Sequence, residues 1–233
     1  MIQVRIIGPN EQKKKKMVKK ANKWFSKITR NKIQLMYVKK FTNRNRISFN
    51  LNLGRKSNNS RNLSGYRLAT FIHEVGHNIH LGHSNQRKRY KQGRFKGSEI
   101  IDKLSIMNSR AVYSNFLTAS QLLKLGVYES NEYIEIDNKN QNQNKNQLKE
   151  IELVDYTGTE PGLKVIIING WAERDKNPLS ISMHKGKVYV HVVHGGGTRL
   201  ISVISTKKTK IIKLLKIETS LYAGKVILDI KLN

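Results

Sequence analysis

The sequence predicts an α+β domain followed by an all-β, sandwich-like domain. In the first half, apolar residues switch between the two-residue period of strands and the longer period of helices. In the second half, short strand-like runs recur at nearly even spacing with turn residues between them. A stretch rich in Asn, Gln and Lys separates the halves and has little to bury. We therefore predict domains at residues 1–129 and 151–233, joined by a linker at 130–150.

Each element at the start of the chain has its own signal. Residues 2–7 alternate and are followed by a Gly-Pro pair, which is typical of a strand. Over about residues 10–32 the apolar positions form one helical stripe, and a run of lysines occupies the other face. Residues 33–41 and 47–53 alternate again. The predicted order is strand, helix, strand, strand.

Two helices complete the first domain. A basic loop rich in Ser and Asn leads into a helix over about residues 65–81, with one apolar face and with His73 and His77 on another. A short helix at 119–125 is preceded by a capping box and followed by a glycine.

The second domain is expected to contain only strands. A Gly-Gly-Gly run at 195–197 predicts a hairpin between two of them. His184, His191 and His194 are interpreted as strand and turn histidines rather than as a second metal site. The expected strands lie at 151–154, 163–168, 179–183, 187–193, 200–205, 210–217 and 225–232.

The charge of the chain is strongly positive and unevenly spread. There are 44 Lys and Arg against 16 Asp and Glu, a net charge of +28, and residues 1–128 hold 28 of these basic side chains and only 4 acidic ones. Such a field attracts polyanions, for example nucleic acid or acidic polysaccharide, and is equally expected of a highly soluble surface.

Several classes of protein are excluded by composition. The chain has no cysteine, so disulfides, Cys-ligated metals and thiol nucleophiles are absent. Its first residues lack the layout of a secretory signal, and no apolar run approaches the roughly 18 residues of a membrane helix. We expect a soluble chain without a transmembrane segment, or a mature form whose leader has been removed.

Four of the seven histidines lie between residues 73 and 83. On a helix, His73 and His77 project from the same face one turn apart and can reach one metal ion. Glu74 lies beside that ion, where it can hold a water molecule and take its proton. The pattern predicts a metal-dependent hydrolase site.

The third ligand is either His80 or His83. On an unbroken helix, His73 and His80 would lie about 10 Å apart along the axis, because each residue rises about 1.5 Å. Zinc–nitrogen bonds are about 2.0–2.1 Å long, so three successive turns cannot share one ion. We therefore expect the helix to end near residues 80–82, with Gly82 or a left-handed His80 turning His83 back to the site.

These residues resemble a known family. The metzincin clan of zinc endopeptidases has a similar three-histidine motif and a downstream Met-turn. Within the clan, the chain is most similar to the gametolysin-like proteases, which digest cell-wall glycoproteins of green algae. The resemblance covers about residues 66–128. Its motifs here are His73-Glu74-x-x-His77-x-x-His80-x-x-His83, Asp102-x-x-Ser105-x-Met107 and the run from Leu117 to Gly126.

The resemblance implies a zinc endopeptidase acting on proteins or glycoproteins. It implies that His73, His77 and His83 bind Zn²⁺, that Glu74 is the general base, and that Met107 forms the floor under the metal. Asp102 becomes a candidate to support the ligands from behind. The family has Gly where this chain has His80, at a position that usually needs a left-handed backbone. This chain departs from the family pattern there, because residues other than Gly seldom adopt that conformation. An extracellular or virion-associated location is compatible with the family.

Two further expectations concern the positive charge. The basic loop that follows the motif should lie near the cleft and favour anionic substrates, through Arg87, Lys88, Arg89 and Lys91. The alternative to a protease is a catalytically inactive metzincin-like protein that uses its basic N-terminal half to bind a polyanion such as nucleic acid.

Overall fold

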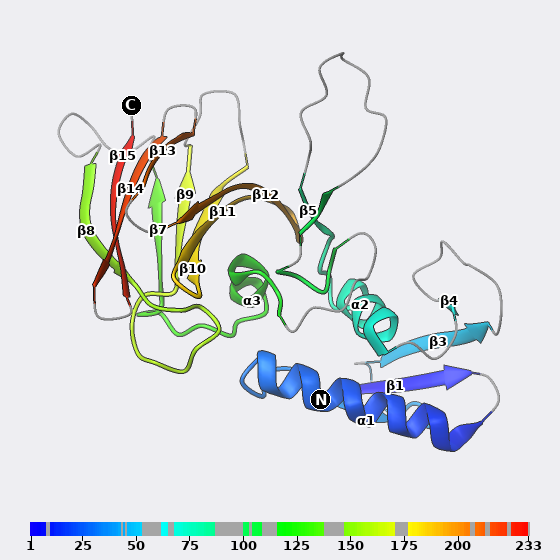
Figure 1. Cartoon of the computed structure of the whole chain (residues 1–233). Coiled ribbons are helices and arrows are strands. Elements are labelled where there is room, and N and C mark those ends of the chain that lie inside the picture. Colours follow the sequence, from blue (N-terminus) through cyan, green and yellow to red (C-terminus); the bar gives the residue numbers. More distant parts are fainter. Residues whose placement is uncertain are drawn as a thin grey trace, which may run out of the picture. The chain divides into compact units, whose positions relative to one another are not determined.

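The computed structural model of the chain is a mixed α+β structure with three sheets, and its C-terminal half is mostly β (Figure 1). It describes residues 1–7, 10–42, 44, 46–52, 62–64, 68–86, 100–102, 104–108, 116–137, 147–170, 177–205, 208–212, 215–222 and 225–232.

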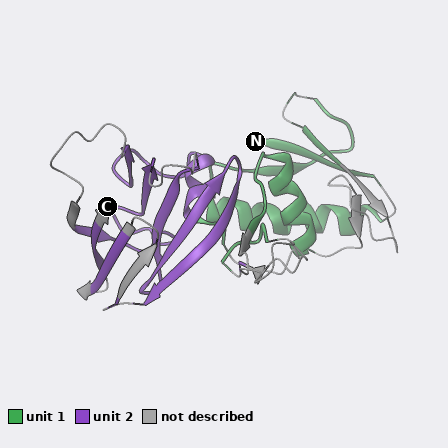
Figure 2. Ribbon diagram, turned by 90° about the horizontal axis from the view of Figure 1, so that it is seen from above, with its two compact units in different colours: residues 1–84, 103–118 green, residues 85–102, 119–233 purple. Residues whose placement is uncertain are grey.

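Two compact units make up the chain (Figure 2). Unit 1 comprises residues 1–84 and 103–118, and unit 2 comprises residues 85–102 and 119–233. Both units are therefore discontinuous in sequence. Residues 85–102, which lie inside the predicted first domain, group with unit 2.

Unit 1 is built on a four-stranded sheet with the order β2-β1-β3-β4, in which every neighbouring pair is parallel. The strands and helices predicted over residues 2–81 are all present: β1 has the predicted bounds, β3 is shifted by one residue and the others are shorter, whereas β4 was not predicted. The elements are β1 (Ile2–Ile7), α1 (Glu11–Ile28), β2 (Leu35–Tyr37), β3 (Arg46–Asn52), β4 (Asn62–Ser64) and α2 (Leu68–Asn78).

Helix α1 is fixed at both ends and along one face. At its start the Asn10 side chain accepts a hydrogen bond from the Lys13 amide at 3.0 Å, and at its end the Thr29 amide donates to the Phe25 carbonyl at 2.8 Å. One face is buried, whereas most of the lysines are exposed. The buried apolar residues are Met17, Val18, Ala21, Trp24 and Phe25.

Unit 2 contains the other two sheets. One has seven strands in the order β6-β5-β12-β11-β10-β9-β7, and the other has four in the order β13-β14-β15-β8. The elements are β5 (Ser84–Gln86), β6 (Ile100–Ile101), α3 (Ala119–Lys124), β7 (Tyr133–Asp137), β8 (Gln147–Leu153), β9 (Val165–Asn169), β10 (Leu179–His184), β11 (Lys187–His194), β12 (Gly197–Ser205), β13 (Thr209–Ile212), β14 (Leu215–Tyr222) and β15 (Lys225–Leu232).

One hydrophobic core joins the two sheets of unit 2. It takes apolar side chains from β7 and β9 to β12 of the larger sheet and from β8, β14 and β15 of the smaller one. The predicted hairpin at residues 195–197 links β11 to β12. The single strand predicted at 210–217 is instead the hairpin of β13 and β14, and part of the predicted linker, residues 133–137, forms β7.

Membrane-spanning helices are not found in the described part of the chain, since none of its helices is both long and apolar enough.

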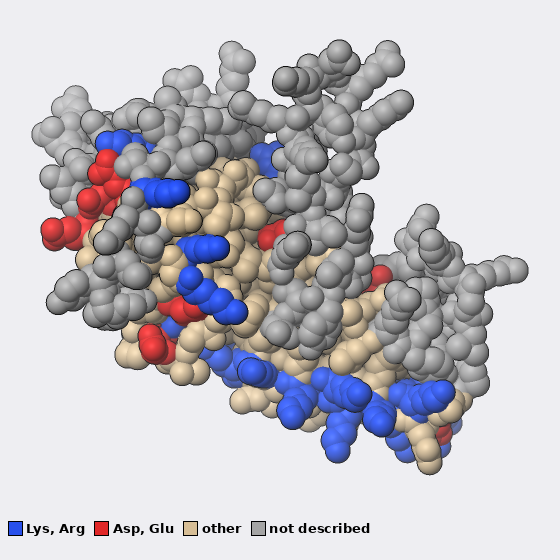
Figure 3. All heavy atoms as spheres, viewed as in Figure 1, with Lys and Arg blue, Asp and Glu red and all other residues tan. Residues whose placement is uncertain are grey.

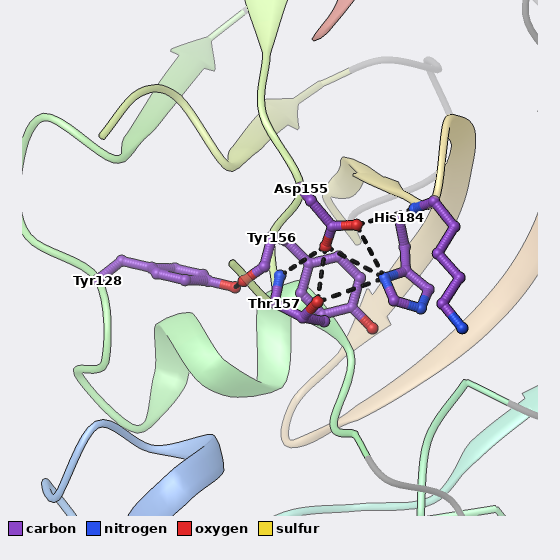
Figure 4. Close-up of polar contacts among 6 residues, drawn as sticks. Tyr128, Asp155, Tyr156, Thr157 and His184 are labelled. Atoms are coloured by element: carbon purple, nitrogen blue, oxygen red, sulfur yellow. Dashed lines mark hydrogen bonds and ion pairs between the residues drawn. The ribbon is translucent and has the colours of Figure 1, made fainter. Parts of the chain in front are cut away.

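A carboxylate clamp holds the turn between β10 and β11 in unit 2 (Figure 4). Asp155 accepts hydrogen bonds from the Lys185 amide at 2.8 Å, from the Thr157 hydroxyl at 2.7 Å and from His184 Nδ1 at 3.1 Å. Burial alone would raise the pKa of the Asp155 carboxyl, but the bonds from His184, the Lys185 amide and Thr157 outweigh it and hold the pKa well below its usual range.

The clamp makes a pH-dependent contribution to stability. We expect Asp155→Asn to lower the free energy of unfolding by about 1–3 kcal/mol at neutral pH. Because the folded-state pKa is depressed, this contribution is complete above the unfolded pKa of about 4 and is lost as the pH falls below it. Urea unfolding at neutral and acidic pH measures the difference between parent and variant.

Glu160→Gln is the matched control, because the Glu160 side chain is exposed and its removal should change stability little at either pH. An Asp155→Asn deficit that stays constant down to about pH 3 would contradict the role of the charge.

Candidate metal centre

Helix α2 supplies the first two histidines of the site. Its buried face carries Phe71, Ile72 and Val75, which anchor the helix in unit 1. His73 and His77 lie one turn apart, with ring centroids separated by 4.6 Å. His73 is buried, and His77 is half-buried.

The chain reverses at the end of α2 through His80. Its φ angle of 66° is left-handed, as the sequence analysis allowed. The His80 amide donates to the His77 carbonyl at 3.1 Å, and the Leu81 amide donates to the Gly76 carbonyl at 3.0 Å. This pair of bonds is the Schellman ending of a helix, in which the left-handed position usually holds Gly. Leu81 is buried beneath the turn, and His83 follows it.

The reversal brings a third imidazole to the other two. His83 Nε2 lies 3.2 Å from His73 Nε2 and 3.1 Å from His77 Nε2. The three ligand atoms all lie within 4.8 Å of one another. His83 is exposed, so the cluster is open to solvent on that side.

Backbone carbonyls fix the rings of His73 and His77. His73 Nδ1 donates to the Ile106 carbonyl at 2.9 Å, and His77 Nδ1 donates to the Leu81 carbonyl at 2.9 Å. The proton therefore lies on Nδ1 in both rings, and both Nε2 lone pairs point toward His83. His83 Nε2 has at most one proton to offer two acceptors, whereas a single cation satisfies all three nitrogens.

The turn at residues 104–108 is hydrogen-bonded to the segments that carry the histidines. It is buried and internally bonded: the Met107 amide donates to Ser105 Oγ at 3.1 Å, and Asn108 Nδ2 donates to the Ser105 carbonyl at 2.8 Å. Besides the Ile106 bond to His73, the Met107 carbonyl accepts from the Ser84 amide at 2.7 Å, directly after His83. One turn thus positions two of the three ligands.

Met107 also packs directly on α2. A Cβ atom added to Gly76 would collide with Met107 Sδ, so the helix and the turn approach this closely because residue 76 has no side chain. Met107 is fully buried. The contact explains why a glycine is tolerated within the helix, where it otherwise costs about 1 kcal/mol relative to alanine.

The protonation states of the site suit metal binding. Burial lowers the pKa of His73 to about 4, with smaller lowering effects from His77 and His83, so the ring is neutral at pH 7 as a ligand must be. Burial raises the pKa of Glu74 to about 7, and its buried Oε2 atom has no hydrogen-bond partner among the described residues. A cation next to this carboxylate would lower that pKa.

The donor set fits a metal ion. Three imidazoles form the cluster, and no other group of three metal-binding side chains is found among the described residues. A tetrahedral site with bonds of about 2.0–2.1 Å requires nitrogens about 3.3 Å apart, close to the 3.2 and 3.1 Å that separate His83 Nε2 from the other two nitrogens. The His73, His77 and His83 cluster could therefore hold a metal ion.

Other predicted site residues are not part of this cluster. Asp102 belongs to unit 2, where its Oδ2 accepts a buried hydrogen bond from His191 Nε2 at 3.1 Å. A role for Asp102 behind the metal ligands stays a prediction. The four basic residues expected near the cleft, Arg87, Lys88, Arg89 and Lys91, lie outside the described residues.

Sequence reasoning missed the groups that orient the ligands. The carbonyls of Ile106 and Leu81 have no signature, because every residue carries one. Ser105 and Asn108, which close the supporting turn, could have been found from their typical use in turns. The carboxylate partners of His184 and His191 are 29 and 89 residues away and were not anticipated.

Comparison with known proteins gives no match: no protein-family model, curated protein or solved structure resembles the chain closely enough to be significant.

The contact between Gly76 and Met107 predicts that Gly76→Ala destabilises the parent protein but not a Met107→Ala variant. In the parent, Gly76→Ala should lower the free energy of unfolding by about 1–3 kcal/mol, because the new methyl group collides with the buried sulfur. In a Met107→Ala background the same substitution should be neutral or stabilising, since alanine favours a helix over glycine by about 1 kcal/mol.

Urea unfolding of all four proteins in this double-mutant cycle measures the coupling. Additive effects of the two substitutions would show that they do not touch.

The choice of third ligand is tested by metal content. After equilibration with zinc and dialysis, His83→Ala should retain far less metal per chain than the parent, because one of three nitrogens is lost. His80→Gly should retain as much as the parent. Without metal it should be more stable by about 1 kcal/mol, because glycine adopts the left-handed conformation at no steric cost. Metal loss from His80→Gly, with retention by His83→Ala, would reverse the assignment.

Proposed function

We propose that the protein is a zinc-dependent endopeptidase that hydrolyses peptide bonds in proteins or glycoproteins, with Glu74 as general base. The observation that carries the proposal is the convergence of three imidazoles, one of which, His73, directly precedes Glu74, whose buried Oε2 atom has no hydrogen-bond partner among the described residues. Three histidines that leave a fourth position open are a known ligand set of catalytic zinc, and the absence of cysteine is consistent with an imidazole-only site.

The zinc ion and the side chains of the protein contribute different parts of the proposed reaction. Zinc supplies Lewis acidity, which polarises a scissile carbonyl and makes water acidic enough to ionise near neutral pH. Glu74 accepts the proton from the attacking water and donates it to the departing amine. Its neighbours leave Oε2 unpartnered, so the carboxylate is available for this transfer. His73 and His77 stay oriented through their bonds to the Ile106 and Leu81 carbonyls.

Several local features support membership of the metzincin clan, and of its gametolysin-like branch, as part of the proposal. The helix ends in a left-handed turn that returns a third histidine, and a buried methionine lies against the glycine between the first two. The two sheets of unit 2 share one core, which supports the sandwich-like accessory domain. The proposed substrate class, cell-wall or other glycoproteins, follows from the resemblance alone.

Removal of the base separates a protease from a protein that only binds metal. We expect Glu74→Gln to keep the zinc content of the parent and to lose peptide hydrolysis by at least about a hundredfold, because the proton acceptor is gone and the ligands are intact. Cleavage of a fluorogenic peptide library and zinc analysis of the same samples measure both.

His80→Gly is the matched control, since it alters a neighbouring residue that the proposal places outside the reaction and should keep both properties. A parent with full zinc content and no hydrolysis of any library member would favour the alternative, an inactive metzincin-like protein.

A further inference from the structure

Helix α1 presents a straight stripe of lysines that the proposed metal site does not use. Its members are separated by four, three and four residues, which places them on one side of the helix over about 17 Å. All are exposed, and the basic row along α1 is visible at the lower edge of Figure 3. The stripe consists of Lys16, Lys20, Lys23 and Lys27.

Neighbouring acids do not neutralise the stripe. Glu11 is the only acidic residue between positions 1 and 42, and it is already bonded to Lys15 at 3.0 Å and to Lys39 at 3.1 Å. In the part of the chain that the structure describes, no salt bridge involves the four lysines of the stripe. Their charge is therefore directed to solvent.

The other side chains of α1 exclude a membrane and a stacked ring as partners of the stripe. Five apolar residues of α1, including Trp24 and Phe25, are buried within unit 1 and Ile28 is half-buried, so the helix has no exposed apolar face to insert into a membrane. For the same reason it offers no exposed ring on which a sugar or an unpaired base could stack. Lysine ammonium groups are point charges that bind phosphate without demanding a fixed geometry.

We propose that this lysine stripe binds the phosphate backbone of a nucleic-acid duplex without reading its sequence. A duplex offers the densest regular row of negative charge, with phosphates about 3.4 Å apart along each strand, so about five of them span the 17 Å of the stripe. The rigid helix matches a rigid, straight partner. The inference does not rest on the proposed metal site, so either proposal can fail without affecting the other.

The salt dependence of binding tests the stripe. Each phosphate contact contributes about −0.9 to the slope of log K against log salt, so four contacts weaken binding about a hundredfold between about 50 and 200 mM salt. In the stripe variant, glutamine replaces Lys16, Lys20, Lys23 and Lys27 together. We expect this variant to bind a short labelled DNA duplex more weakly than the parent, with a slope shallower by about 3 to 4. Fluorescence anisotropy measures both, with several unrelated sequences.

A control variant with the same net charge replaces four exposed lysines of unit 2 by glutamine. It should change the slope by less than about one. The four control positions are Lys124, Lys185, Lys187 and Lys208. Circular dichroism and urea unfolding confirm that both variants stay folded.

Three results would overturn the proposal. Equal losses in the two variants would show that diffuse net charge, rather than the stripe, attracts DNA. Tighter, stripe-dependent binding to a sulfated polysaccharide than to the duplex at the same salt concentration would identify a different partner. Binding to only one of the DNA sequences would show that bases are read.

Discussion

The candidate metal site depends on the left-handed conformation of His80. If α2 had continued, the ten residues from His73 to His83 would span about 15 Å along the axis, far beyond the reach of a shared ion. A positive φ at one residue ends the helix and returns the chain, and the two Schellman bonds lock that ending. A side chain other than glycine costs about 1–2 kcal/mol there, although histidine is among the residues that adopt this conformation more readily. The burial of Leu81 directly after the turn helps to offset that cost.

Once the chain has turned, backbone carbonyls rather than side chains orient the ligands. Ile106 fixes His73 from the supporting turn, and Leu81 fixes His77 from within the reversal itself. The reversal therefore has two effects, because it delivers His83 and also supplies the acceptor for His77. Substitution of the Ile106 or Leu81 side chain leaves the backbone carbonyl acceptors in place. The orientation of the two histidine rings is therefore sensitive to shifts of the backbone rather than to these side chains. The close contact of Gly76 with Met107 limits such shifts.

The sequence predicted those parts of the site that depend on spacing. The spacing of His73 and His77 gives a shared face, and the length of a zinc–nitrogen bond rules out His80 in favour of His83 once the helix is allowed to end. The orienting carbonyls were not predictable, because no residue type encodes them. Strands β4 to β6 have only two or three residues, too short for an alternating pattern, and β5 is entirely polar. The pairing of Asp102 with His191 joins segments 89 residues apart, which no local pattern can report.

The lysines of α1 are compatible with the fold without being required by it. Like charges four residues apart on a helix cost about 0.2–0.5 kcal/mol per pair, and the stripe contains two such pairs, Lys16 with Lys20 and Lys23 with Lys27. Full burial of one large apolar side chain contributes about 1.5–3 kcal/mol, so Phe25 alone outweighs the repulsion. The helix would therefore form at least as well with neutral polar residues on its exposed face. Packing and helix stability therefore do not account for the stripe, and its charge is consistent with solubility and with the proposed phosphate partner.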